Sequence, residues 1–226
     1  MIIFVDNEHA NGYEQSWGEM LLAARVRIKY RLEDITGKPC LIVRYNHVTP
    51  ELLQRLNARA VFISGNGTDE TLYTEADRAG IRAAIREKAW PMFGFCGGFQ
   101  LIAQSYGAPL EPIGPLPVGA EDAYPDFAPG QQKEFGYQPV HITKQHPLLT
   151  GLGQNPVMRQ AHSWEIKSLP KGFTNYAVTD VTPIQLMIHD NLPIVGTQFH
   201  PEYFTDAHPG GRVLIENFCK MAGLID

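Results

Sequence analysis

Residues 91–106 read PMFGFCGGFQLIAQSY, and this stretch decides the fold. The mostly apolar run 91–95 is typical of a buried strand, and the residues after it predict a short helix that begins almost at once. Cys96 lies at the junction, with Gly94 and Gly98 two residues away on either side. Such a tight turn crowds the backbone, so only small neighbours fit. The stretch therefore predicts a nucleophile elbow that lifts a cysteine sulfur above the edge of a sheet.

The position of Cys96 gives its sulfur two chemical advantages. The N-terminus of the following helix should favour the thiolate, which is the nucleophilic form of cysteine. The backbone N–H of Gly97 should point towards an oxyanion that develops on a substrate. The alternative is a small buried apolar residue, which is the usual role of a cysteine. We expect that role for Cys40 and Cys219, because each lies inside an apolar run.

A cysteine nucleophile needs a base, and His200 is the best candidate among eight histidines. It directly follows the strand-like run 194–199 and precedes Pro201, which favours an extended conformation at the histidine. Residues two apart in an extended segment point to the same side, so Glu202 should reach the imidazole and orient it. The alternative is a strand end with an ordinary surface ion pair.

Strands alternate with helices through the first half of the chain. The expected strands are 2–5, 40–43, 60–64 and 91–95, and the expected helices are 17–32, 74–88 and 98–106. This alternation predicts an α/β fold with a mostly parallel open sheet flanked by helices, with ligands bound beyond the carboxyl ends of the strands. The second half has strand-like runs at 138–143, 175–178, 184–188 and 194–199 before a final helix at 212–221. There we expect a smaller antiparallel region, within a single domain 1–226.

Two loops are candidate functional segments. Gly65, Asn66 and Gly67 follow the third expected strand, where backbone N–H groups could face an anion or a polarised carbonyl. The same residues would also suit a plain turn or a phosphate cradle, although no Walker lysine follows. The segment 109–129 holds six prolines and predicts an extended loop, either a flap or a docking surface.

Composition narrows the classes of partner. The net charge of −5 and the lack of basic runs argue against nucleic acid or an anionic membrane as a partner. No apolar stretch approaches the length of a membrane span, and the N-terminus does not resemble a signal peptide. Three scattered cysteines form neither a disulfide framework nor a metal site, so we expect a reduced cytoplasmic protein without a metal or organic cofactor.

Together these motifs resemble those of the class I, triad-type glutamine amidotransferase domain. Residues 94–100, GFCGGFQ, are similar to its nucleophile motif, and residues 198–202, QFHPE, to its histidine-glutamate motif. Asp6 and Asn7 are similar to the start of several members. The resemblance runs in order over nearly the whole chain, and it implies a flavodoxin-like sheet.

The resemblance implies a role for each member of a triad. Cys96 would attack the side-chain carbonyl of glutamine and form a γ-glutamyl thioester. His200 would pass a proton to the leaving ammonia and then activate water, and Glu202 would orient His200. Gln100 would contact the bound glutamine. Ser163 and Trp164 would hold its amino-acid end, unless their stretch is only a strand with an aromatic anchor.

The chain departs from the family pattern at one position of the oxyanion hole. The resemblance implies that Gly97 and the loop at Gly65 form this hole, but Asn66 stands where many members have a glycine. Asparagine tolerates unusual backbone angles better than most residues. Either the hole forms in the free protein, or it forms only when a partner docks and basal activity is low. Loss of one oxyanion donor typically costs about 10² to 10³ in rate.

Three functions remain open. In the first, the chain is a glutaminase subunit that passes ammonia to a separate synthetase, since only one helix follows the triad. In the second, it is a stand-alone hydrolase of γ-glutamyl peptides or amides. In the third, it is a non-enzymatic regulatory or binding member of the fold, which the presence of all three triad residues disfavours. The sequence alone does not decide between free glutamine and a larger γ-glutamyl substrate.

Overall fold

A mostly parallel sheet forms the centre of the computed structural model, which describes residues 1–226. Its parallel strands are β1 (Ile2–Asp6), β2 (Cys40–Arg44), β3 (Ala60–Ile63), β4 (Met92–Phe95) and β12 (Ile194–Thr197). Its antiparallel strands are β7 (His141–Ile142), β10 (Phe173–Val178) and β11 (Leu186–His189). The strand order is β2-β1-β3-β4-β12-β11-β10-β7. The predicted α/β fold, with an antiparallel region in the second half, is confirmed.

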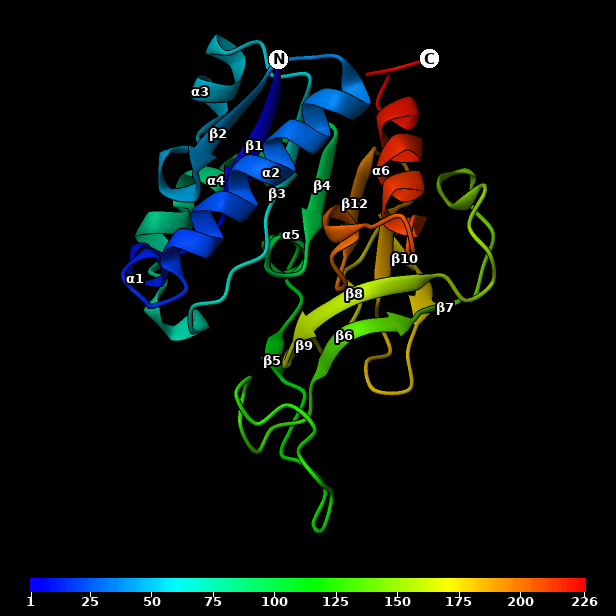
Figure 1. Cartoon of the computed structure of the whole chain (residues 1–226). Helices are drawn as coiled ribbons and strands as arrows, with labels where there is room; N and C mark the ends of the chain where they lie inside the picture. The colour runs from blue at the N-terminus through cyan, green and yellow to red at the C-terminus, as the bar shows by residue number, and fades with distance from the viewer.

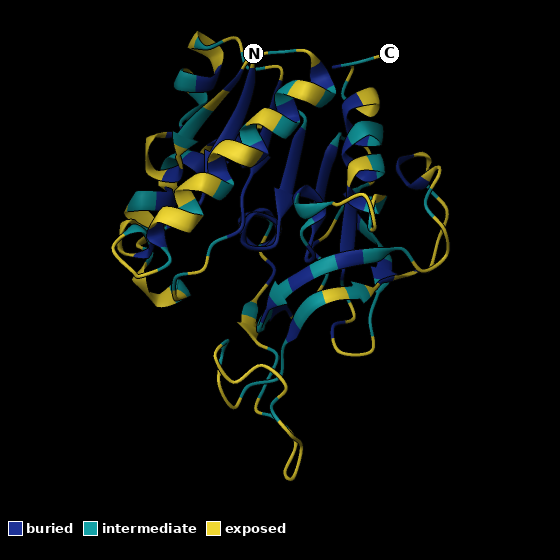
Figure 2. Ribbon diagram, in the orientation of Figure 1, coloured by how far each residue is buried: buried dark blue, intermediate teal, exposed yellow.

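Helices cover both faces of this sheet (Figure 1). The helices are α1 (Ala10–Tyr13), α2 (Gly18–Thr36), α3 (Pro50–Arg55), α4 (Glu75–Glu87), α5 (Gly97–Ser105) and α6 (Gly210–Met221). Side chains of β1 alternate between two cores, as the pleat of a strand requires. Ile2 and Phe4 pack with residues of α2 and α6, whereas Ile3 and Val5 pack with residues of α3 and α4. The central strands are therefore buried from end to end (Figure 2).

Local signals set the ends of two helices. Thr74 caps α4, because its side chain accepts a hydrogen bond from the N–H of Asp77. Helix α2 runs four residues beyond the predicted end at Leu32 and stops at Gly37, which has a φ of +62°. The left-handed conformation of this glycine ends the helix, whereas the predicted end rested on the apolar pattern alone.

The prediction of one strand at 138–143 is wrong. The chain instead forms β6 (Glu134–Pro139) and then β7, which belong to different sheets. Strand β6 pairs with β8 (Val157–His162), and β5 (Leu110–Pro112) pairs with β9 (Trp164–Ile166). The predicted loop therefore contains one short strand. Short 3-10 segments are η1 (Tyr45–His47), η2 (Glu70–Leu72), η3 (Pro147–Leu149) and η4 (Pro201–Tyr203).

The carboxyl ends of the parallel strands face the two small sheets and the long loop between β5 and β6 (Figure 1). This is the end of the sheet where α/β proteins place their ligands. Largely exposed residues form the loop, which projects away from the sheet (Figure 2). None of the helices combines the length and the apolar character that crossing a membrane requires.

Candidate active site

Cys96 lies at a sharp elbow between β4 and α5. Its φ of +48° and ψ of −107° are unusual for a residue with a side chain. The surrounding backbone fixes this conformation: the N–H of Cys96 donates to the carbonyl of Thr197 at 2.7 Å, and its carbonyl accepts from the N–H of Gln100 at 2.9 Å. Strain of this kind costs about 1 to 3 kcal/mol and is concentrated at functional sites. The predicted sharp turn between strand and helix is present at Cys96.

The glycines on either side of Cys96 allow the elbow to form. A Cβ atom on Gly94 would come within 2.5 Å of the backbone of Gly98. A Cβ atom on Gly98 would overlap the carbonyl oxygen of Ile63 on the neighbouring strand β3. Both close approaches involve backbone atoms, which cannot move aside cheaply. The sequence argument that only small residues fit here is confirmed.

Glu202 contacts His200 as predicted, although not for the predicted reason. Nδ1 of His200 lies 2.7 Å from Oε1 of Glu202. The segment is not extended throughout, since Pro201 begins the 3-10 segment η4. The short turn brings the carboxylate within hydrogen-bond distance of the imidazole. The N–H of His200 also donates to the carbonyl of Arg159 on β8, which anchors the histidine to the small sheet.

His200 and Cys96 are immediate neighbours across Gly65. The position of a Cβ atom on Gly65 would be 2.8 Å from Cε1 of His200 and 3.3 Å from Cβ of Cys96. Burial alone would lower the pKa of His200, but the carboxylate of Glu202 and the sulfur of Cys96 raise that pKa to about 10. The arrangement therefore favours a protonated imidazole beside the sulfur, the charge state that stabilises a thiolate.

Cys96 opens onto a cavity of about 600 Å³. Its lining residues come from the loop after β3, from α5, from the β8–β9 turn and from the long loop. Asp126, Phe127 and Ala128 belong to the long loop, so this segment forms one wall of the cavity, as a flap would. A second wall contains Trp17, which sequence reasoning missed. No cluster of three or more histidine, cysteine or acidic side chains has the geometry to hold a metal ion.

The predicted oxyanion residues meet at one side of Cys96. The backbone nitrogen of Asn66 lies 3.0 Å from the point where a Cβ atom of Gly97 would be, so the two peptide groups are adjacent. The side-chain amide of Asn66 donates to the carbonyl of Thr68 at 3.1 Å, and its oxygen accepts from the amide of Asn7 at 3.4 Å. Gly65 is buried between Cys96 and His200. The structure thus brings together all the residues predicted for this role.

The predicted substrate-binding residues line the same cavity. Gln100, Ser163 and Trp164 are all part of its wall. Nε2 of Gln100 donates to the carbonyl of Trp164 at 3.0 Å and to Oε1 of Gln198 at 3.1 Å. Gln198 in turn directs its own amide towards Sγ of Cys96 at 3.6 Å. Gln198 belongs to the sequence motif, but the sequence predicted no role for it.

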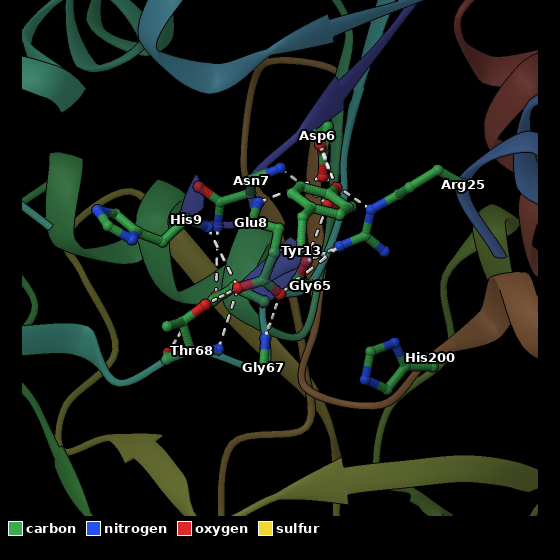
Figure 3. Close-up of polar contacts among 12 residues, drawn as sticks. Asp6, Asn7, Glu8, His9, Tyr13, Arg25, Gly65, Gly67, Thr68 and His200 are labelled. Atoms are coloured by element: carbon green, nitrogen blue, oxygen red, sulfur yellow. Dashed lines mark hydrogen bonds and ion pairs between the residues drawn. The ribbon is translucent and has the colours of Figure 1, made fainter. Parts of the chain in front are cut away.

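Sequence reasoning also missed a buried charge cluster at the end of β1 (Figure 3). Nε of Arg25 lies 2.8 Å from Oδ1 of Asp6, and Nη2 of Arg25 donates to the carbonyl of Gly65 at 2.9 Å. Glu8 accepts hydrogen bonds from the loop that follows Asn66. The sequence signal that could have revealed this cluster is the pair of acidic residues, Asp6 and Glu8, at the carboxyl end of a buried strand.

The fold and the site define an α/β protein in which a cysteine at a nucleophile elbow adjoins a histidine-glutamate pair. The family model for class-I glutamine amidotransferase matches residues 27–222, and the chain belongs to this family. It is 31% identical to a Methanopyrus kandleri protein whose name describes one subunit of a glutamine-hydrolysing GMP synthase, over 84% of this chain and 89% of that protein.

Other relatives match over different shares of their length. The chain is 30% identical to the protein of the same name from Pyrococcus furiosus, over 59% of this chain and 61% of that protein, so it spans less than two thirds of that relative. It is also 30% identical to a Phenylobacterium zucineum protein named as a whole glutamine-hydrolysing GMP synthase, over 84% of this chain but only 33% of that protein. This family can therefore form part of a longer polypeptide.

Solved structures of low sequence identity have the same fold. A Thermoplasma acidophilum protein, described as a candidate subunit of GMP synthase, superposes with a TM-score of 0.72 at 23% identity, covering 99% of this chain and 94% of that chain. A glutamine amidotransferase from Thermotoga maritima superposes with a TM-score of 0.58 at 13% identity, covering 97% of this chain and 81% of that chain.

Proposed function

We propose that the chain hydrolyses the side-chain amide of glutamine to glutamate and ammonia, with Cys96, His200 and Glu202 as a catalytic triad. One observation carries this proposal: Cys96 lies at a strained elbow, next to a histidine paired with a carboxylate, and opens onto a cavity. Membership of the class-I glutamine amidotransferase family and relatives named as glutamine-hydrolysing support it.

The reaction begins when Sγ of Cys96 attacks the side-chain amide carbon of glutamine. The protonated imidazole of His200 gives its proton to the amide nitrogen, the carbon–nitrogen bond breaks, and ammonia leaves a γ-glutamyl thioester. His200 then takes a proton from a water molecule as the water attacks the thioester carbon. The carbon–sulfur bond breaks, glutamate leaves, and the thiolate of Cys96 is restored beside His200, which keeps the proton taken from water.

Three further sets of residues support these steps. The N–H groups of Gly97 and Asn66 would stabilise the oxyanion of each tetrahedral intermediate. Glu202 holds the ring of His200 through Nδ1, which leaves the other nitrogen for proton transfer. Gln100, Ser163 and Trp164 would position the amino-acid end of glutamine, because they line the cavity that Cys96 faces.

We further propose that the protein works in the cytoplasm and that its ammonia passes to a synthetase on a separate polypeptide. The basis is the name of two relatives, which describes one subunit of a glutamine-hydrolysing GMP synthase. Co-purification of a synthetase with the tagged chain, and glutamine-dependent product formation by the pair, would support this partner. A chain that purifies alone from its source and gains nothing from added synthetase would contradict it.

The first experiment is ammonia release from glutamine by the purified protein, beside a Cys96→Ala control. Release by the wild type and none by the variant would establish the glutaminase reaction. Equal release by both proteins would exclude Cys96 as the nucleophile. Both samples should first give the same circular dichroism spectrum and melting temperature within a few degrees, so that misfolding does not imitate a loss of chemistry.

A second candidate function is hydrolysis of larger γ-glutamyl peptides or amides. The size of the cavity favours this alternative, because about 600 Å³ lies within the range of sites that hold drug-sized ligands. A panel of γ-glutamyl amides with increasingly large amine groups would distinguish the two. Higher kcat/KM for the larger compounds than for glutamine would make the hydrolase the better assignment.

A further inference from the structure

The loop that follows Asn66 binds a carboxylate of the protein itself. The N–H of Gly67 donates to Oε2 of Glu8 at 2.6 Å, and the N–H of Thr68 donates to Oε1 at 3.1 Å. The hydroxyl of Thr68 and the N–H of His9 also contact Oε1. A glycine-rich loop that could have cradled a phosphate or a substrate carboxylate instead cradles Glu8 (Figure 3).

A carboxylate suits this position because every group that forms a hydrogen bond with it acts as a donor. Its two oxygens can accept all of these hydrogen bonds, whereas the amide of a glutamine would direct an N–H group at one of the donors. The side chain of Glu8 is completely buried, and Nη2 of Arg25 is 4.0 Å from Oε2. Burial raises the pKa of Glu8, while the N–H groups of Gly67 and Thr68 and the charge of Arg25 oppose that rise.

Arg25 holds the other side of Asn66. Its Nη2 donates to the carbonyl of Gly65 at 2.9 Å, and its Nε is fixed by Asp6 at 2.8 Å. The carbonyl of Gly65 and the N–H of Asn66 belong to one planar trans peptide group, so they point in opposite directions. By binding the carbonyl, Arg25 fixes the direction in which the N–H of Asn66 points.

We propose that Glu8 and Arg25 are positioning residues, which together fix the peptide groups on both sides of Asn66 so that its N–H completes the oxyanion hole beside Gly97. This inference rests on the glutaminase function proposed above. Neither residue lines the cavity or touches Sγ of Cys96, so their effect reaches the reaction only through the loop. This positioning by Glu8 and Arg25 also explains how a loop with asparagine at this position keeps a defined geometry without a docked partner.

Kinetics of Glu8→Gln test the inference against a merely structural role. We expect kcat for glutamine to fall about 10²-fold, towards the effect of losing one oxyanion donor, while KM changes less than about threefold. Alkylation of Cys96 by iodoacetamide should keep its rate, because that displacement forms no oxyanion. Arg25→Lys, which keeps the charge beside Asp6 but shortens the reach to Gly65, should lower kcat in the same way.

Glu33→Gln is the matched control. Glu33 also accepts a backbone hydrogen bond, from the N–H of Cys40 at 2.8 Å, and pairs with Lys29 at 2.7 Å. It lies near the C-terminal end of α2 and has no contact with the loop at Asn66. We expect this variant to keep the wild-type kcat and KM. If Glu8→Gln also keeps both, or if kcat and the iodoacetamide rate fall together, the positioning role is overturned.

Amide hydrogen exchange measured by NMR decides the inference even without turnover. In the wild type, the N–H groups of Gly67 and Thr68 should be protected. In Glu8→Gln they should exchange at least about tenfold faster, while amides of β1 and β3 stay unchanged. Unchanged protection at both residues would overturn the inference. If the wild type releases no ammonia from glutamine, either alone or with its synthetase, the proposed function fails, and the exchange data still decide whether Glu8 holds the loop.

Discussion

Oε1 of Glu202 lies 2.7 Å from Nδ1 of His200, and this is the only hydrogen bond that the carboxylate side chain makes. The side chain of Glu202 is 2% exposed, and its second oxygen has no partner. Burying a carboxylate costs free energy unless hydrogen bonds compensate for the lost water. Here the imidazole of His200 is the only side-chain partner that compensates for this cost. Substitutions at Glu202 therefore report on the orientation and charge of His200.

Glu202→Gln should lower kcat for glutamine by about 10²- to 10⁴-fold, the range for one positioned acid–base group. The loss should be smaller than that of Cys96→Ala, since orientation is a partial effect and the nucleophile is retained. KM should stay nearly unchanged, because Glu202 does not line the cavity. Steady-state ammonia release measures both constants, and an unchanged kcat would exclude an orienting role for Glu202.

The pKa of His200 predicts how stability depends on pH. In the fold this pKa is raised from 6.5 to about 10, so folding favours the protonated ring. The resulting stabilisation is fully present below pH 6.5 and is lost as the pH rises through 10. The free energy of unfolding of the wild type, relative to that of His200→Gln, should therefore decline from pH 6.5 to pH 10. Urea unfolding at several pH values measures it, and a constant difference would contradict the charged pair.

Much of the fold was predictable because it depends on residues that are close together in the sequence. The alternation of apolar strands with helices predicts the parallel sheet, and the glycines around Cys96 predict the elbow, since both depend on neighbouring residues. The contact of Glu202 with His200 is also local, because only Pro201 separates them. The specific roles of Asn66 and Gln100 came from the family resemblance, and the structure brings both residues to the cavity.

The small sheets could not be predicted because long-range partners define them. Strand β8 shows no apolar alternation, since its buried face includes Gln160 and His162. These polar groups are tolerated there because Gln185 and Glu134 bond to them at 3.1 Å and 3.0 Å.

Two other features were missed for opposite reasons. Helix α3 carries local signals, because Thr49 caps it and a proline occupies its first turn, so the sequence could have predicted it. The role of the buried Glu8 could not be predicted in the same way, because its partners in the loop are 59 and 60 residues away.

Replacing Cys96 should separate backbone strain from chemistry. Cys96→Gly and Cys96→Ala both remove the sulfur and should both abolish turnover. Glycine adopts a φ of +48° without strain, whereas alanine does not. We therefore expect Cys96→Gly to be more stable than Cys96→Ala by about 1 kcal/mol, even though glycine makes the unfolded chain more flexible. Chemical denaturation of the two variants measures the difference, and a less stable glycine variant would show that the elbow is not strained.

Asn66→Gly tests whether the oxyanion hole uses the backbone of this residue, as the family pattern suggests, or its side chain. The backbone N–H remains in the glycine variant, and Glu8 and Arg25 still bind the residues on either side. We therefore expect kcat to stay within about threefold of the wild type, far from the roughly 10²- to 10³-fold cost of a lost donor. Stability should fall by about 1 kcal/mol, because glycine is more flexible and the side-chain bond to Thr68 is lost.

Asn66→Pro provides the contrast, because proline has no N–H to offer an oxyanion. Its kcat should fall by the full cost of a donor, about 10²- to 10³-fold, provided that circular dichroism shows an intact fold. The two variants together show whether the backbone N–H or the side chain of residue 66 serves as the oxyanion donor. If Asn66→Gly loses as much activity as Asn66→Pro, the side-chain amide is the donor. The hole would then depend on the contacts of that amide with Asn7 and Thr68.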